Sequence, residues 1–345
     1  MDANTNKAYK MAMKAAKTPL LIVLPFISII LLWVLGMTLL GNWSLFTKYW
    51  PMSLTMTLGS FIAGATSEGG GAFAFPVLTL IFKTPPSVAR DFSWMIQAVG
   101  MSMAALTLII LKTPLYKKII LPISLGGFLG IIPGLKFIAP IMAPDYCKIF
   151  FTSLWLSFGI WIFIIEKKRA SRPIKELFLK DPLSIKDFNI LFTVGLLGGQ
   201  ISALTGTGLD IFTFAFLTLF YNLDVKKATL TSIVLMAINS LGGLLIKGMF
   251  YQSFSPLAVN YWWVSVPVVI FGAPLGAAFI KGRSKELILK ILGFSILTQF
   301  ILSYFIIPMT VELFSFSLFI FLMGLFFFSL IQKRFHFNFP NVEFK

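Results

Sequence analysis

The sequence reads Thr66-Ser67-Glu68-Gly69-Gly70-Gly71 in the middle of an apolar run that extends over residues 53–82. A second apolar run, residues 188–220, is interrupted in the same way by Thr205-Gly206-Thr207-Gly208-Leu209-Asp210. Shifting the first run by 139 residues aligns it with the second without a gap and gives ten identities over residues 66–98. We interpret the two runs as copies of one duplicated segment, each a membrane helix broken by glycine at its middle.

The composition places the whole chain in a membrane. Hydrophobic residues make up 57% of it and charged residues only 12%, which is not typical of a water-soluble domain. Beside the two broken runs we predict eight continuous spans of roughly the ~20 residues that cross a bilayer core: residues 19–40, 92–111, 119–135, 147–165, 230–246, 261–280, 287–307 and 311–331. The predicted fold class is an all-α integral membrane protein.

The distribution of basic residues predicts the topology. The net charge is +16, and we attribute it to membrane orientation instead of nucleic-acid binding. If each broken run enters and leaves on one side while the eight continuous spans cross, 23 of the 29 Lys and Arg residues face the same side. The positive-inside rule makes that side the cytoplasm. We therefore expect re-entrant hairpins, cytoplasmic N- and C-termini and a plasma (inner) membrane location.

This topology divides the chain into five parts. Residues 1–50 hold a basic N-terminus and a first transmembrane helix, interpreted as a retained signal anchor; residues 51–165 form the first repeat. A basic cytoplasmic linker covers residues 166–187, the second repeat residues 188–307, and a last helix and basic tail residues 308–345. Because each repeat crosses three times, the second copy is inverted relative to the first. The two glycine-rich tips are then expected to meet near the bilayer midplane, where transporters of this architecture bind substrate.

The expected chemistry of the tips is that of helix N-termini. We predict half-helices over residues 72–82 and 211–220, whose first N–H groups lack partners inside the helix and attract anions. Gly69, Gly70, Gly206 and Gly208 would let a ligand approach the backbone, with hydroxyl donors from Thr66, Ser67, Thr205 and Thr207. Gln97 and Asn239 either line the cavity or bond between helices. For Gly126, Gly127, Gly242, Gly243 and Gly272 we prefer close helix packing.

Two acids complicate a purely anionic site. Glu68 and Asp210 lie at membrane depth, where an ionisable side chain is costly and is usually functional. Either they cap the half-helices, or one of them carries a proton so that an anion and a proton share the site in turn. A third alternative is that both bind a transported cation directly.

Enzymatic functions find little support. The single histidine, His336, lies near the C-terminus, and no GxxxxGK[ST] phosphate loop is present. Cys147 is the only cysteine, which excludes an intramolecular disulfide and argues against a cysteine metal site. We expect no enzyme activity, no cofactor and no metal. The expected partners are a small anion and the lipid bilayer, without nucleic acid.

The first tip also carries a family signature. Residues Gly69-Gly70-Gly71-Ala72-Phe73-Ala74-Phe75-Pro76-Val77-Leu78, followed by Pro86-Ser87-Val88-Ala89, resemble the sulfite exporter TauE/SafE family, also called the four-TMS sulfite/organosulfonate carrier group. The resemblance covers approximately residues 50–307. It implies transport of sulfite, sulfonates, thiosulfate or related sulfur anions by a protein built from two repeats. The second repeat departs from the signature at Leu209, Asp210 and Ala215.

The resulting prediction is a secondary carrier of small anions, most simply sulfur oxyanions or organosulfonates, with Glu68 or Asp210 coupling protons. The alternatives are a cation- or proton-coupled carrier in which the two acids hold the cation, and a membrane scaffold or channel that does not transport by a carrier cycle. Direction of transport and oligomeric state stay open.

Overall fold

The computed structural model describes residues 23–66, 69–171, 183–251 and 254–338. Throughout these residues the regular structure is helical, without a strand. Eight helices in the described part are long and apolar enough to cross a membrane. They are α4 (Pro86–Ile110), α5 (Lys117–Pro133, extended by a π-helical turn, Gly134–Ile138), α6 (Pro144–Ser171), α7 (Ile185–Thr205), α9 (Val225–Phe250), α10 (Pro256–Lys281), α11 (Lys285–Ile306) and α12 (Val311–Asn338). The predicted all-α, multi-pass fold class is confirmed, and seven of these helices match predicted continuous spans. The eighth, α7, is the first half of the second broken run and is by itself long enough to cross, whereas the predicted span 19–40 is not one of the eight.

The first apolar helix is bent away from its successor. Helix Val23–Leu39 meets the segment Asn42–Ala65 at an angle of 102°, and the two together pass the same length and hydropathy test. Gly41 lies at the break with φ 65°, a left-handed conformation that glycine adopts without strain. The lysines at 7, 10, 14 and 17 of the predicted anchor lie outside the described residues.

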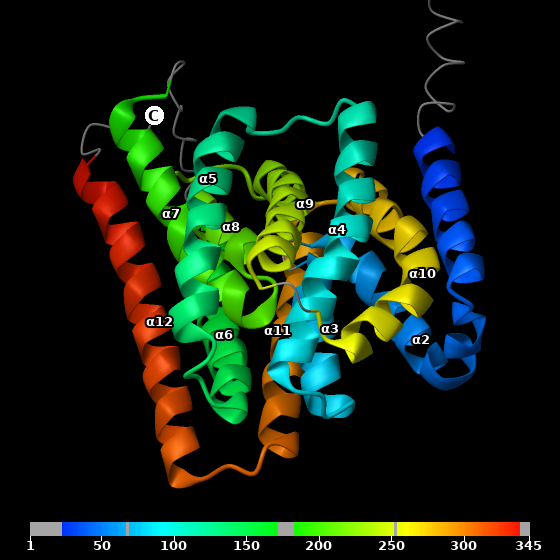
Figure 1. The fold of residues 1–345 in the computed structure, drawn as a ribbon. Coiled ribbons are helices and arrows are strands. Elements are labelled where there is room, and N and C mark those ends of the chain that lie inside the picture. Colours follow the sequence, from blue (N-terminus) through cyan, green and yellow to red (C-terminus); the bar gives the residue numbers. More distant parts are fainter. Residues whose placement is uncertain (1–22, 67–68, 172–182, 252–253, 339–345) are drawn as a thin grey trace, which may run out of the picture.

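Both predicted interruptions are present. The first lies between α2 (Leu45–Ala65) and α3 (Gly69–Pro76), and α3 continues as a π-helical turn, Val77–Ile81. The second lies between α7 and α8 (Leu209–Leu219). At 1.5 Å per residue, α8 spans only about 16 Å, roughly half a bilayer core. Figure 1 shows α8 folded back beside α7, and α3 leading away from the inner end of α2.

The half-helices begin earlier than the sequence predicted. We expected starts at residues 72 and 211, whereas α3 begins at Gly69 and α8 at Leu209. The prediction treated the whole glycine run as irregular. In the structure only Gly69, with φ 73°, is left-handed, and the following glycines join the helix. A helix satisfies its own N–H and C=O groups, which matters more at membrane depth than the intrinsic cost of glycine.

Reciprocal packing ties the two halves of the chain together. α2 lies against α10, while α7 lies against α5, so each first hairpin helix contacts the other half of the chain. A Cβ on Gly64 would overlap the carbonyl of Ala273, and a Cβ on Gly134 would lie 2.5 Å from the Cβ of Ala203. Adding 139 to 64 and to 134 gives 203 and 273, so the two contacts are equivalent positions of the predicted duplication. The equivalence of these two contacts supports the predicted internal duplication.

Close helix packing accounts for the glycines to which we gave that role. A Cβ on Gly126 would overlap the carbonyl of Phe192, and one on Gly272 would overlap the hydroxyl of Ser60. A Cβ would likewise overlap the side chain of Leu209 if placed on Gly127, of Phe128 if placed on Gly242 and of Trp94 if placed on Gly243. Helices in lipid approach one another closely where such small residues lie, and the packing interpretation is confirmed.

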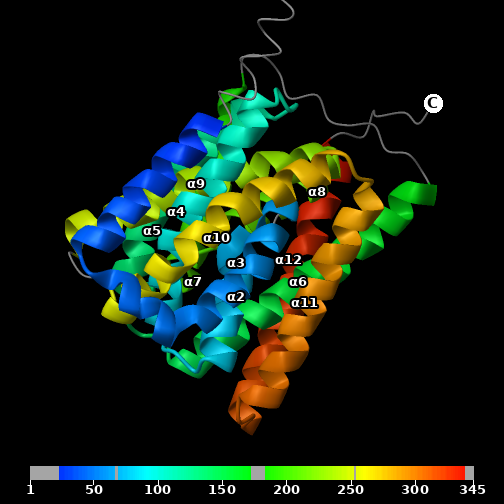
Figure 2. The same cartoon turned by 90° about the vertical axis from the view of Figure 1, so that its right-hand side faces the viewer.

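The helix ends alternate between two sides of the bundle. Figure 1 shows the α4–α5 connection, the start of α7 and the end of α12 at the top, and the α11–α12 connection at the bottom. In Figure 2, α11 and α12 run beside α6 as a steep group, and α6 packs against both of them. Side-chain caps begin several helices, with Ser184 Oγ accepting from Asp187 N (3.1 Å) and Asp224 Oδ1 from Lys227 N (2.9 Å).

Candidate functional site at the two helix breaks

At the first break the last described residue before the gap, Thr66, is fully buried. α2 ends at Ala65, and Thr66 takes an extended conformation with φ −132° and ψ 173°. The Thr66 hydroxyl donates to the carbonyl of Ile62 at 2.9 Å. Gly69 then opens α3 in the left-handed region. Ser67 and Glu68, two of the predicted site residues, lie outside the described residues, and of Gly70 only the helical backbone is described.

The second break is held by its own side chains. Gly206 ends α7 with φ 77° and donates its N–H to Ser202 O at 2.7 Å, while Gly208, with φ 117°, precedes α8. The Thr205 hydroxyl donates to Thr207 O at 2.9 Å. Asp210 Oδ1 accepts from the Gly208 N–H at 2.8 Å and from the Thr207 hydroxyl at 3.3 Å. One oxygen of Asp210 therefore caps the start of its own helix.

The other oxygen of Asp210 faces the opposite tip. A Cβ placed on Gly69 would lie 3.1 Å from Asp210 Oδ2 and would overlap the thioether of Met236 on α9. Asp210 is 1% exposed, and its Oδ2 receives no hydrogen bond among the described residues. The structure thus brings Gly69 and Asp210 together from the two breaks. It places a carboxylate oxygen at the N-terminal end of α3.

Gln97 and Asn239 both contact the second hairpin. Gln97 Nε2 donates to Gly206 O at 3.0 Å and to Ser93 O at 2.9 Å. Asn239 Nδ2 donates to Ser202 Oγ at 2.9 Å, and the same hydroxyl accepts from Trp94 Nε1 at 3.2 Å. Each amide keeps a buried carbonyl oxygen, Gln97 Oε1 and Asn239 Oδ1, without a hydrogen-bond partner in the described part of the chain.

A small cavity opens beside Gln97, between α2, α4 and α10. It has room for about one water molecule. Ser60 and Gln97 are among the residues around it, although the cavity wall itself is apolar, and Ser60 Oγ and Gln97 Oε1 are both buried without a partner in the described residues.

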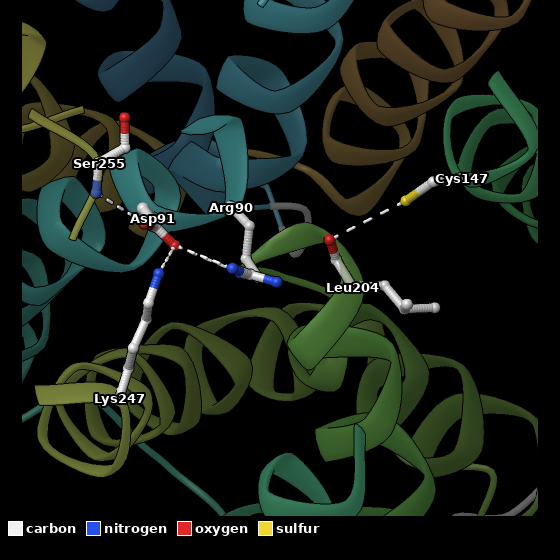
Figure 3. Close-up of polar contacts among 6 residues, drawn as sticks. All are labelled: Arg90, Asp91, Cys147, Leu204, Lys247 and Ser255. Atoms are coloured by element: carbon white, nitrogen blue, oxygen red, sulfur yellow. Dashed lines mark hydrogen bonds and ion pairs between the residues drawn. The ribbon is translucent and has the colours of Figure 1, made fainter. Parts of the chain in front are cut away.

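A buried ionic cluster is the main feature that sequence reasoning missed. Asp91, at the start of α4, is 2% exposed. Its Oδ1 pairs with Lys247 Nζ of α9 and accepts from Arg90 Nε and Nη2 at 3.3 and 3.2 Å, while Oδ2 accepts from Ser255 N at 3.1 Å. Figure 3 shows Arg90 and Lys247 reaching the Asp91 carboxylate from two directions.

The sequence did hold a signal for this cluster. Arg90 and Lys247 are two of the six Lys and Arg residues that the charge distribution assigns to the non-cytoplasmic side. Lys247, however, lies in an otherwise apolar helical stretch, where an ionisable residue is a functional candidate by default. Figure 3 also draws Cys147, whose Sγ lies 4.0 Å from Leu204 O and which makes no contact with the cluster in this view.

Comparisons with known proteins agree with the signature at the first tip. A family model described as sulfite exporter TauE/SafE matches residues 52–302, from α2 to α11. This match includes both breaks, Gln97, Asn239 and the ionic cluster. Searches of curated proteins and of solved structures find no match to the chain.

Proposed function

The chain belongs to the sulfite exporter TauE/SafE family, and on that premise we propose that it is a secondary carrier of small sulfur oxyanions or organosulfonates. Membership and the eight apolar helices make it a multi-pass membrane protein of a transporter family. The substrate, the coupling ion and the binding residues are the parts that we propose. For membrane and orientation we propose the plasma (inner) membrane with both termini in the cytoplasm.

The observation that carries the proposal is the meeting of the two breaks. Gly69 begins α3 against Asp210 and Met236, and α8 begins one residue before Asp210. Many carriers bind their substrate between interrupted helices whose ends converge inside the bundle. Their N-terminal N–H groups favour an anion, and the glycines keep side chains away from the backbone. We propose that substrate binds here, with Gly69, Gly70, Gly206 and Gly208 shaping the site.

The threonines play a smaller part in this site than their hydroxyls suggested. Thr66 and Thr205 donate to backbone carbonyls at the breaks, and Thr207 donates to Asp210. We propose that these residues hold the tips in shape and contact the substrate mainly after the tips move. Gln97 and Asn239 position the second hairpin through donors, and their remaining carbonyl oxygens suit a protonated or ammonium-bearing group of the substrate.

Asp210 points to a proton as the coupling ion. An ionised carboxylate at the N-terminal end of α3 competes with a substrate anion for the same positive helix end. Protonation of Asp210 removes that competitor and turns Oδ2 into a hydrogen-bond donor for the substrate. The proton would bind and leave with the anion. The sequence alone favoured Glu68, on the glycine-rich tip, over Asp210 as the proton carrier, and Glu68 stays a candidate outside the described residues.

One alternative has an observation in its favour. Because Oδ2 of Asp210 is buried without a partner in the described residues, a transported cation would also satisfy it. In that case Asp210→Asn abolishes substrate binding itself. In the proton-coupled carrier, the same variant still exchanges anions at equilibrium.

The test is a flux panel in proteoliposomes with sulfite, thiosulfate, sulfoacetate, taurine and chloride on the wild-type protein. We expect saturable uptake of one or more sulfur anions that an imposed pH gradient drives above equilibrium, and little uptake of chloride. A flux that does not saturate would identify a channel. A flux no higher than that of empty vesicles would indicate a scaffold that does not transport. Either result would overturn the carrier proposal.

A further inference from the structure

The cluster of Arg90, Asp91 and Lys247 contains two cations and one carboxylate. The side chains of Asp91, Lys247 and Arg90 are 3%, 8% and 12% exposed. Both oxygens of Asp91 are engaged, Oδ1 by the two cations and Oδ2 by Ser255 N. Within the described residues no second carboxylate pairs with Arg90 or Lys247. The cluster therefore holds one positive charge more than its own acid balances.

An unbalanced buried charge is costly. Moving an ion out of water carries a penalty of several kcal/mol, which is recovered only with a partner of opposite charge. Arg90 directs Nε and Nη2 to one oxygen of Asp91, and within the described part of the chain Nη1 makes no hydrogen bond. The guanidinium carbon lies 5.9 Å from the centroid of the Trp94 ring. In Figure 3 the free end of the guanidinium points away from Asp91. A guanidinium edge of this kind matches the planar spacing of oxyanion oxygens.

The cluster is linked to the helix breaks through two helix faces. On α9, Met236, Asn239, Gly243 and Lys247 recur at helical spacing, and Met236 lies against Gly69 while Lys247 reaches Asp91. On α4, the backbone of Arg90 lies against Gly206, which also accepts from Gln97. The 11 residues from Met236 to Lys247 correspond to about 16 Å, roughly half of a bilayer core. If the tips lie at the midplane, the cluster lies at the membrane–water boundary.

We propose that Arg90 and Lys247 form a second anion site, which receives a small oxyanion at the boundary on its way to or from the helix breaks. The proposal rests on the proposed function for the identity of that anion. Asp91 has two roles in it: it holds the two cations in place and it keeps their affinity for the anion low enough for release. The surplus charge is then balanced during transport by the substrate.

The rival explanation is a purely structural ion pair that joins α4, α9 and the start of α10. The two explanations predict opposite signs for one variant. If the cluster binds an anion, Asp91→Asn removes a competing negative charge and tightens binding, whereas Lys247→Gln weakens it. If the cluster only joins helices, both variants loosen the same contact, and any effect on anion binding has the same sign.

The experiment measures sulfite binding by titration calorimetry on the full-length protein in nanodiscs at constant ionic strength. We expect Lys247→Gln to raise the Kd for sulfite at least tenfold and Asp91→Asn to lower it. Lys83→Gln is the matched control, because it removes one exposed cation from the loop preceding α4, and it should leave the Kd unchanged. A higher Kd in Asp91→Asn, or an equal rise in Lys83→Gln, overturns the proposal.

A second pair keeps the test decisive if Asp91→Asn does not fold. Lys247→Arg retains the charge and Lys247→Gln does not, so only the first should bind sulfite with near-wild-type affinity; equal affinities overturn the proposal. Flux separates this inference from the proposed function. Wild-type protein that transports sulfite, with all variants unchanged in Kd and KM, refutes the second site alone. Wild-type protein that binds sulfite with the expected order of variants but moves no sulfur anion refutes the carrier and leaves the site.

Discussion

Replacing Gly69 with alanine tests the meeting of the two tips most directly. Gly69 has φ 73°, where an L-residue costs about 1–2 kcal/mol relative to glycine. The added methyl group would also overlap the Met236 thioether and lie 3.1 Å from Asp210 Oδ2. Met236 is flexible and able to move aside. The methyl beside Oδ2 cannot be avoided, and it covers the N-terminal end of α3.

Gly41→Ala is the matched control. Gly41 has φ 65°, almost the same backbone conformation, but a Cβ there would meet nothing within 4 Å. Both variants should therefore lose about 1–2 kcal/mol of unfolding free energy from the backbone alone. Only Gly69→Ala should also lose function, because only there does the methyl lie in the proposed substrate site.

The assay compares sulfite uptake into proteoliposomes with thermal unfolding of the same preparations. We expect at least a tenfold lower initial rate for Gly69→Ala and a near-wild-type rate for Gly41→Ala, at comparable losses of Tm. If Gly69→Ala transports as well as Gly41→Ala, the space between Gly69 and Asp210 is not part of the transport path.

Three further predictions follow from other parts of the structure. Cysteines at Lys83 and Lys226 should react with an impermeant maleimide from opposite sides of the membrane; labelling from one side would exclude inverted repeats. Gly64→Ala should lower the unfolding free energy by about 1–3 kcal/mol, because its Cβ would overlap a backbone carbonyl of α10, whereas Gly248→Ala, whose Cβ would have only an ordinary contact at 3.7 Å, should not lower Tm. Asp210→Asn should keep the helix cap and the Tm but lose accumulation driven by a pH gradient, and unchanged accumulation would make this acid structural.

Much of the fold is predictable from the sequence because a bilayer restricts the choices. Continuous apolar runs of about 20 residues must be helices, since no other open structure satisfies the backbone in lipid. The two breaks are predictable because glycine adopts the left-handed conformation that they require. Gly69 has φ 73° and Gly208 has φ 117°. The exact helix starts are less predictable, because a glycine run in lipid joins a helix when nothing else satisfies its backbone.

The helix breaks lie where the sequence predicts them, but the contacts of their side chains differ from the expectation. The sequence placed Thr66, Thr205 and Thr207 at the breaks, and we expected their hydroxyls to contact ligand. In the structure each hydroxyl has a partner in the protein. A helix break leaves buried polar groups without helical partners, and nearby hydroxyls satisfy them first. Residue type alone does not show whether a threonine hydroxyl bonds the protein backbone or a ligand.

For the ionic cluster, the sequence indicates Lys247 as a candidate but does not show its partners. Asp91 and Lys247 are 156 positions apart, and each has a plausible local role near a helix end. Only the packing of α4 against α9 brings them into contact. The same packing of α4 against α9 places Gly243 against Trp94. It also lets Asn239 and Trp94 donate hydrogen bonds to the same hydroxyl, that of Ser202.

A path along α9 from the ionic cluster to the helix breaks leads from a net positive cluster to a carboxyl group. At one end the cluster is net positive, and near the helix breaks Asp210 is the nearest described acid, with one oxygen free of hydrogen bonds. For the carrier that we propose, an anion would be attracted at the boundary and opposed at the centre as long as Asp210 is ionised. A path that were positive throughout would bind the anion and retain it. A protonatable acid at the centre instead lets the anion pass only when a proton is bound. This condition is what couples anion transport to proton transport.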